Sequence, residues 1–321
     1  MAIAAAPPPV PRVTPTAARR QAPSMRRIGE KRFAGYAFVL PHFAVFTLMI
    51  AIPFFYNIWI SLSDFTGFGG GEKFIGLQNF RNLADPNDYH FPLFWNGLWN
   101  TTIFVLISTP MLVISGLFLA VLINNKFRGR NAFRAIYFAP WTLGISVIGL
   151  LWWWIFNGSF GLLTNFLSSW GIASPQWLTT QPWAWFTIFL ATLWWTVGFN
   201  TIILLAGLQA ISVDLYEAAS IDGANRWQQF RFVTVPSLRP VLLLVITLQV
   251  IASFNVIGQP QIMTGGGPGN ETRSVLQYVY ETGFTNGGQY QVGQAAAMAL
   301  VVAAIMVIVS VINFRVFRSE D

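Results

Sequence analysis

Few side chains in this chain could carry out chemistry. It has two histidines, His42 and His90, and no cysteine, so a thiolate metal or redox site cannot form. No HExxH or GxSxG motif is present, and no nucleophile with a neighbouring base can be identified. A phosphate-binding loop needs Gly-Lys followed by Ser or Thr, and none of Lys31, Lys73 and Lys126 follows a glycine. The chain is therefore predicted to contain no catalytic residue, no metal site and no cofactor of its own.

One polar stretch, residues 216–236, carries an ordered set of helix signals, YEAASIDGANRWQQFRFVTVP. Just before it, Asp214 is placed to cap a first helix, and Glu217 follows three residues later, as in a capping box. Gly223 permits the left-handed conformation that ends a helix. These residues predict a short helix followed by a sharp turn.

A second short helix is predicted directly after this turn, with Trp227 and Phe230 on its apolar face and Pro236 at its end. The small residues Ala218 and Ala219 on the first helix would let a partner approach its backbone. The order therefore predicts a helix-turn-helix that docks on another protein. An inert amphipathic connector, in which the acidic residue only caps its own helix, fits the same residues.

The elements on either side are apolar enough to lie in a membrane. Of 321 residues, 54% are hydrophobic and only 10% charged, whereas a soluble domain has about 25% charged residues. A bilayer core of about 30 Å needs about 20 apolar residues per helix. Apart from Arg239, six long runs contain no Asp, Glu, Lys or Arg, and prolines 41, 53, 110 and 140 are predicted to kink them. The predicted spans are 35–61, 96–123, 136–156, 183–208, 237–258 and 293–314.

The distribution of positive charge predicts the orientation of these spans. Of the 19 Lys and Arg residues, all but Lys73, Arg81 and Arg273 fall in the N-terminal tail, in the loop after the second span, in the 216–236 region with the nearby Arg239, or at the C-terminus. Cytoplasmic loops carry the excess of Lys and Arg. Both termini and the helix-turn-helix are therefore expected in the cytoplasm, which is consistent with an even number of spans.

The predicted fold class is all-α, a polytopic membrane protein with six transmembrane helices and a cytoplasmic helix-turn-helix loop at about residues 209–236. Residues 1–34, rich in Ala, Pro and Arg, are predicted to form a disordered cytoplasmic tail, and residues 35–321 a single transmembrane domain. Outside the membrane, residues 264–270, TGGGPGN, are expected to form a flexible, projecting turn or a plain connector.

The polar stretch resembles a known signature. Glu217-Ala218-Ala219, Gly223, and the later Val233, Val235 and Pro236 are similar to the EAA signature of permease subunits of binding-protein-dependent ABC importers, with valines at two positions where Ile and Leu are usual. Three further segments resemble the carbohydrate-uptake group of these permeases, of the maltose and glycerol-3-phosphate types. They lie in the same order over roughly residues 35–317 and are FIGLQNF at 74–80, Asn100-Thr101 and Thr264-Gly265-Gly266-Gly267-Pro268.

The resemblance implies a mechanism in which this chain is a non-catalytic subunit. A second, homologous permease would complete the path, two ATPase subunits would bind ATP and Mg, and an external binding protein would deliver the solute. The chain would lie in the bacterial plasma (inner) membrane and bind no nucleic acid. By resemblance, the residues that contact the ATPase are Glu217, Ala218, Ala219, Asp222, Gly223 and Ala224.

The solute path is expected among polar and aromatic side chains of the fourth and fifth spans. Aromatic faces stack on sugar rings and amides bond hydroxyl groups, although membrane helices use the same amides to bond one another. The candidates are Thr192, Trp195, Phe199, Asn200, Gln249, Ser253, Phe254 and Asn255.

Three functions remain open from the residues. An importer permease for a mono- or oligosaccharide is favoured, with glycerol-3-phosphate or a polyol as the alternative solute. A secondary carrier is disfavoured because such carriers place ionisable residues at membrane depth, where this chain has, besides Arg239 near the end of the fifth span, only His42. A membrane-bound assembly protein would bind partners but move no solute.

Overall fold

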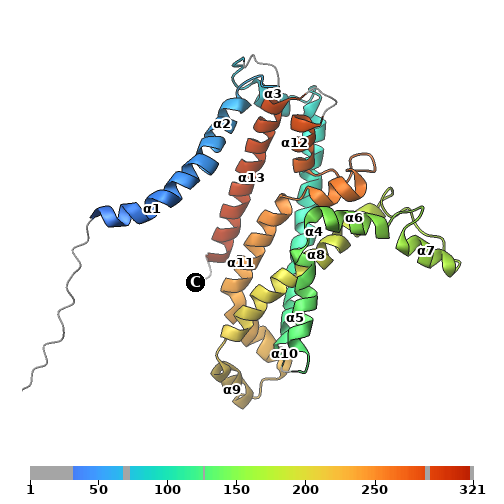
Figure 1. Cartoon of the computed structure of the whole chain (residues 1–321). Coiled ribbons are helices and arrows are strands. Elements are labelled where there is room, and N and C mark those ends of the chain that lie inside the picture. The colour runs from blue at the N-terminus through green and yellow to red at the C-terminus, as the bar shows by residue number, and fades with distance from the viewer. Residues whose placement is uncertain (1–31, 68–72, 126, 286–289, 319–321) are drawn as a thin grey trace, which may run out of the picture. The chain divides into compact units, whose positions relative to one another are not determined.

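The computed structural model describes residues 32–67, 73–125, 127–285 and 290–318 (Figure 1). Within these residues the secondary structure is helical, apart from one antiparallel bridge between Ser63 and Phe74, which confirms the all-α prediction. The chain divides into two units after Phe54. Most of the predicted tail lies outside the described residues, but residues 32–34 already belong to the first helix.

The first unit contains α1 (Arg32–Phe46) and a single π turn, η1 (Thr47–Ala51), which leads into α2 (Ile52–Ser61). Residues Phe38–Ser61 form an apolar helical span, close to the first predicted span. Pro41 lies inside α1, which continues through it.

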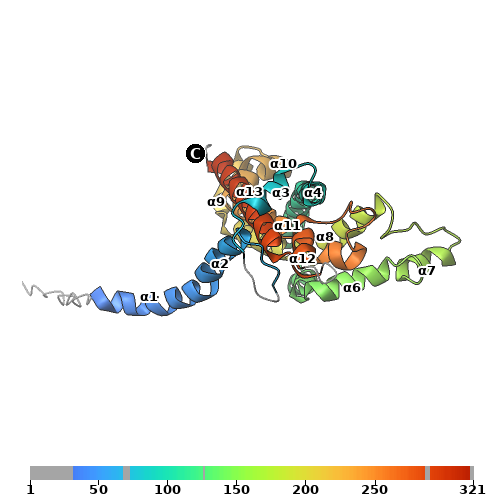
Figure 2. The ribbon, with the colours of Figure 1, turned by 90° about the horizontal axis from the view of Figure 1, so that it is seen from above.

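The second unit is organised around α4 (His90–Asn124), α8 (Trp183–Ala210) and α11 (Val235–Phe254), which pack on one another. Figure 2 shows these helices clustered with α12 (Val275–Phe284) and α13 (Val292–Arg318). Apolar runs form the contact because each helix presents aliphatic side chains to its neighbours. Their shared core contains Val113, Ala120, Ile123, Leu204, Leu205, Leu208, Leu238 and Val245.

The third predicted span is bent. α5 (Arg130–Phe138) and a 3-10 turn, η2 (Ala139–Thr142), meet α6 (Ile145–Ile155) at an angle of 98°. The break follows from two residues, because Pro140 cannot donate a helical hydrogen bond and Gly144 is extended. A straight helix over 136–156 is therefore wrong, although a proline kink there was expected. α7 (Leu162–Ser169) follows, and Figure 2 shows α6 and α7 projecting from the helix cluster.

Five single helices are long and apolar enough to cross a membrane, and the bent pair makes up to six among the described residues. All but the first belong to the second unit. α3 (Gln78–Ala84) and α12 lie at one end of this unit, and the short α9 (Val213–Ile221) and α10 (Arg226–Gln229) lie at the other (Figure 1). These ends are called the α3 end and the α9 end below.

The helix that begins at α10 does not stop at Pro236, contrary to the prediction. α10 continues through a π turn, η3 (Phe230–Thr234), directly into α11, so that Arg226–Phe254 is one span. Pro236 lies directly after this π turn, in the first turn of α11, and the helix passes through it. The fifth span therefore starts eleven residues earlier than expected and carries the second helix of the helix-turn-helix as its own first turns.

Candidate functional site

The first helix of the polar stretch, α9, ends as its sequence predicts. Asp222 is its C-cap and Gly223 follows with φ of +81°. The amide of Gly223 donates to the carbonyl oxygen of Ser220 at 3.1 Å, and the amide of Ala224 donates to that of Ala219 at 2.9 Å. This pair of bonds is a Schellman motif, so the left-handed turn at Gly223 is confirmed.

The start of α9 differs from the prediction. Ser212, not Asp214, is the N-cap, and its hydroxyl oxygen accepts the amide of Asp214 at 3.2 Å. The error arose because Ser212 and Asp214 are both good capping residues, and spacing alone did not separate them. Glu217 therefore lies beyond the capping positions, in the second turn.

Glu217 is exposed on α9, and within the described part of the chain its carboxylate has no hydrogen bond or ion pair. A capping role inside its own helix is thus ruled out. Ala218 is also exposed, whereas Ala219 and Ala224 are half-buried. A carboxylate without an internal partner, beside a small residue, leaves both available to another protein.

The turn between α9 and α10 is braced by side chains whose role the sequence analysis missed. Asn225 caps α10 and forms a reciprocal capping box with Gln228, at 2.9 Å and 2.7 Å. The N-x-x-Q spacing was a readable signal of this box. Gln229 then donates to the hydroxyl oxygen of Ser220 at 2.9 Å. The two short helices are therefore held at a defined angle.

Further along, the Tyr216 hydroxyl lies 3.0 Å from that of Thr234, which ties α9 to the start of the long α11 helix. The segment nevertheless leaves a set of large apolar side chains in the open. Ile221 is 86% exposed and Trp227 69% exposed. Apolar side chains gathered on an exposed element are typical of an interaction surface. The others are Val213, Leu215 and Phe232.

Seven of the eight predicted path residues line a single cavity of about 270 Å³ between α8, α11 and the bend of the third span. Phe254 is the exception, because it is buried but does not line the cavity. Spacing on α8 and α11 placed the other seven on facing surfaces. They are Thr192, Trp195, Phe199, Asn200, Gln249, Ser253 and Asn255.

The deepest of these side chains bond one another. The Asn200 amide donates to Oε1 of Gln249 at 3.1 Å, and the Gln249 amide donates to the Ser253 hydroxyl at 3.1 Å. That hydroxyl lies 3.0 Å from the hydroxyl of Ser108 on α4. All four residues are buried. This chain of bonds ties α4, α8 and α11 together, as polar groups do between membrane helices.

The more accessible wall of the cavity is aromatic. Trp141, which the sequence analysis missed, stacks on Phe199 with ring centroids 4.6 Å apart and lies 5.6 Å from Trp195. The Trp195 indole N–H donates to the carbonyl oxygen of Leu143 at 3.2 Å. Trp141 enters the site only because the chain bends at Pro140, so no periodicity pointed to it.

Two polar side chains complete the mouth of the cavity. Asn255 caps α11 and is exposed. Its side-chain amide donates to the carbonyl oxygen of Ile251 at 2.8 Å, so among the described residues its side-chain oxygen has no hydrogen-bond donor. Gln259 lies within 3.4 Å of the Thr192 hydroxyl. No Lys, Arg, His, Asp or Glu lines this cavity. It can therefore offer stacking and neutral hydrogen bonds, but no charge.

A larger hollow of about 880 Å³ opens at the α3 end and contains Asp64, Asn82, Asp88 and Gln294. It contains none of the predicted path residues and lies at helix ends rather than between spans. The amide of Asn79 holds this region together by donating to the carbonyl oxygens of Ser61 and Ser63. Asn79 belongs to the FIGLQNF segment, and these two bonds give it a structural role.

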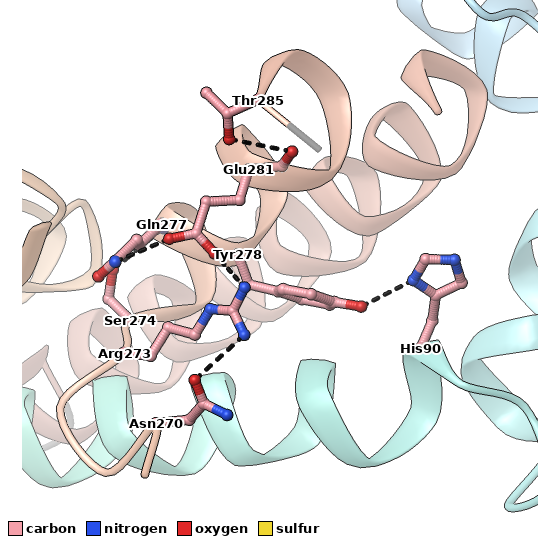
Figure 3. Close-up of polar contacts among 8 residues, drawn as sticks. All are labelled: His90, Asn270, Arg273, Ser274, Gln277, Tyr278, Glu281 and Thr285. Atoms are coloured by element: carbon pink, nitrogen blue, oxygen red, sulfur yellow. Dashed lines mark hydrogen bonds and ion pairs between the residues drawn. The ribbon is translucent and has the colours of Figure 1, made fainter. Parts of the chain in front are cut away.

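The turn after α11 is fastened at the same end (Figure 3). Arg273 forms an ion pair with Glu281, and its guanidinium lies 4.7 Å from the centroid of the Tyr278 ring. Gln277 donates to the other oxygen of Glu281 at 2.8 Å. Burial raises the pKa of Tyr278 to about 12, so its hydroxyl stays protonated and shares a 2.7 Å hydrogen bond with Nδ1 of His90.

Asn100 and Thr101 on α4 hydrogen-bond to the backbone of this turn. The Asn100 amide donates to the carbonyl oxygens of Asn270 and Arg273 at 2.8 Å and 3.1 Å, and the Thr101 hydroxyl accepts the amide of Val275 at 2.9 Å. Gly266 is buried. These bonds hold the 264–270 turn against α4 and α12, while Gly265, Gly269 and Asn270 remain exposed. That the turn is flexible stays a prediction.

Known proteins share both sequence and fold with this chain. Residues 112–319 match the family described as binding-protein-dependent transport system inner membrane component. The chain is 35% identical to the trehalose/maltose transport system permease protein MalF of Thermococcus litoralis, over 88% of this chain and 94% of that protein. It is 31% identical to the sulfoquinovosyl glycerol transport system permease protein SmoG of Agrobacterium fabrum, over 90% and 92%.

The fold is also similar to a chain in the crystal structure of a bacterial alginate ABC transporter in complex with an alginate pentasaccharide-bound periplasmic protein. The TM-score is 0.76 at 22% identity, over 89% of this chain and 94% of that one. At this identity the likeness concerns the fold alone.

Proposed function

This chain belongs to the family of binding-protein-dependent transport system inner membrane components, and from that premise we propose that it forms half of the translocation path of an ATP-driven sugar importer. The observation that carries the proposal is the exposed α9–α10 segment at the end of the bundle, where the Glu217 carboxylate has no partner among the described residues. The sequence itself contains no phosphate-binding loop that could use ATP. A chain without an energy source needs a partner that supplies one.

Separate ATPase subunits would supply the energy by binding ATP and Mg, and they would bind this chain at α9. The contact would use the Glu217 carboxylate, the open surface at Ala218 and the exposed apolar side chain of Ile221. Because the capping box and the Schellman motif hold α9 rigidly against α10, which continues into α11, a push on α9 would be transmitted along a whole span. A second, homologous permease would form the other half of the path.

Charge reversal at Glu217 tests this contact without disturbing the fold. Glu217→Lys is expected to lower ATP-driven uptake in liposomes by about 100-fold or more, because it places a cation where a desolvated carboxylate would bind. The thermal unfolding temperature should not change, since the carboxylate has no internal partner. Glu217→Gln keeps the shape and should lose less. Wild-type uptake by Glu217→Lys would contradict the docking role.

The proposed orientation of the chain in the membrane depends on its positive charges and on the location of the ATPase. The α9 end carries Arg128, Arg130, Arg226 and Arg231, and cytoplasmic loops are enriched in such residues. An ATPase that uses cellular ATP must also meet α9 in the cytoplasm. We therefore place both termini and α9 in the cytoplasm of a cell whose inner membrane holds the importer. The α3 end would receive solute from an external binding protein.

The solute is proposed to be a neutral mono- or oligosaccharide. Related permeases are named for trehalose/maltose and sulfoquinovosyl glycerol transport, and the cavity combines an aromatic wall with uncharged hydrogen-bonding groups. Such a surface suits sugar rings and hydroxyl groups. Glycerol-3-phosphate is the weaker candidate, because its phosphate would meet no cation here unless the partner permease provides one.

Substitutions in the cavity should separate solute contact from helix packing. Trp195→Ala and Asn255→Ala, on the accessible wall, are expected to reduce the uptake rate about 10-fold through lost stacking or hydrogen bonding. Asn200→Ala and Gln249→Ala should lower the unfolding temperature as well, because each leaves a buried amide unpaired. Phe254→Leu, outside the cavity, is the control for uptake. Unchanged kinetics in all four cavity variants would remove the cavity from the path.

Purification and transport together test the function as a whole. The chain is co-expressed with its partner permease and ATPase, purified through a tag on this chain, and placed in liposomes with a sugar-loaded binding protein. We expect the ATPase to copurify and uptake to require ATP. Uptake that follows membrane potential without an ATPase would identify a secondary carrier. A complex that hydrolyses ATP but moves no solute would point to an assembly role.

A further inference from the structure

Two arginines on α5, Arg130 and Arg134, lie one helical turn apart. Both guanidinium groups donate to the side-chain oxygen of Gln209, on the last turn of α8, when its amide oxygen is turned toward them. Within the described part of the chain, no carboxylate forms an ion pair with either arginine. Two positive charges therefore converge on one neutral acceptor.

The hydrogen bonding of the two guanidinium groups is incomplete. The Nε–H groups of both arginines are closed off from solvent and have no hydrogen-bond acceptor. Like charges at this helical spacing repel each other, and partly buried cations are stabilised by an anion that also satisfies their donors. The pair has the donors and the charge for a group with several anionic oxygens.

The position of the pair suggests where that anion comes from. α5 begins six residues after α4 leaves its apolar span at Asn124, so the arginines lie at the edge of the membrane. Phe133 and Ile136, on the same helix, are 47% and 66% exposed. An open hollow of about 570 Å³ lies over the first turn and contains Arg128 and Arg130. Exposed apolar groups beside cations match a molecule with acyl chains and a charged head.

We propose that Arg130 and Arg134 bind the phosphate of an anionic phospholipid headgroup, with the acyl chains lying along Phe133 and Ile136. Basic pockets between transmembrane helices on the cytoplasmic side bind anionic lipid headgroups. Gln209 is three residues before Ser212, the cap of α9, so the lipid would stiffen the joint between α8 and the α9–α10 segment. The inference needs only that the chain spans a membrane and does not depend on the solute transported.

The test compares lipids on the purified complex by native mass spectrometry. The wild-type complex is expected to retain phosphatidylglycerol more tightly than phosphatidylcholine. In R130Q/R134Q this preference should fall about 10- to 30-fold, which is about three- to fivefold for each cation removed. R226Q/R231Q, which removes two exposed charges from the same end, is the matched control and should keep the preference.

Additional variants and lipid measurements can contradict the lipid site. If R130Q/R134Q does not fold, R130K/R134K keeps the charge but loses the forked donors, and an intermediate preference is expected. Equal retention of both lipids by the wild type, or an unchanged preference in R130Q/R134Q, would overturn the site. Displacement of the lipid by inorganic phosphate would show a free-anion site instead. Retention only by the chain without its partner subunits would assign the arginines to a partner carboxylate.

Discussion

Gly223→Pro is expected to abolish ATP-driven uptake while the protein still reaches the membrane in normal amounts. The backbone at Gly223 has φ of +81°, and proline fixes φ near −65°. The substitution also removes the amide that bonds Ser220. Both elements of the Schellman motif would fail, and α9 would point in another direction. Apart from its chain neighbours, no described residue would lie within 4 Å of a Cβ at Gly223, so the bundle itself should stay intact.

A matched control exists at the end of α7. Gly171 has φ of +71°, its amide bonds Ser168, and the next amide bonds Leu167, which is the same motif in a second place. Nothing lies within 4 Å of a Cβ there either. Gly171→Pro therefore suffers the same local damage away from α9.

We expect Gly171→Pro to retain most of the uptake and Gly223→Pro to retain none. The measurement is ATP-driven uptake in liposomes, together with ATP hydrolysis and the amount of copurified ATPase. Loss of the ATPase would indicate a broken contact, whereas hydrolysis without uptake would indicate uncoupling. Equal, near-normal uptake by both variants would mean that the angle of α9 does not matter. The proposal that α9 couples ATP hydrolysis to uptake would then be withdrawn.

Gly198→Ala is expected to prevent the protein from folding. A Cβ at this position would lie 1.9 Å from the carbonyl oxygen of Tyr137 and 2.6 Å from its carbon. Both are backbone atoms, so no side-chain rotation relieves the clash, and overpacking that shifts the backbone costs about 1–3 kcal/mol or more. α8 would have to move away from the bend, which would also separate Phe199 from Trp141.

The control lies in the same bend. Gly144→Ala places its Cβ in open space, and the backbone there is extended, with φ of −69°. We expect fluorescence-detected size-exclusion chromatography to show a normal monodisperse peak for Gly144→Ala and little or none for Gly198→Ala. A folded, active Gly198→Ala protein would show that α5 and α8 can separate without cost, and the bent geometry would then be less constrained than the structure indicates.

The features that sequence predicted well depend on neighbouring residues. Long uncharged runs were assigned to spans because each must satisfy its backbone hydrogen bonds within one helix. The turn at Gly223 was predicted because only a residue tolerant of positive φ ends a helix in this way. Even the errors here were small, since Ser212 and Asp214 are both good caps and the signals lie two residues apart.

The contents of the cavity were predictable in part. Helical spacing on α8 and α11 brought seven candidates together, because residues three and four apart share a face. Whether a given amide faces the solute or another helix was not predictable, since the same atoms serve both purposes. Only the packing of α8 on α11 decided that Asn200 and Gln249 bond each other while Trp195 and Asn255 remain accessible.

By itself, the sequence determined that this protein is an all-α membrane chain with a helix-turn-helix carrying Glu217 and Gly223 between two of its spans, because hydropathy, capping and left-handed turns act over a few residues. The tertiary structure alone decided which side chains meet. Trp141 joined the cavity, and Arg130 and Arg134 converged on Gln209, because the chain bends at Pro140 and α5 lies against α8. Such contacts join segments far apart in the chain, and no local spacing records them.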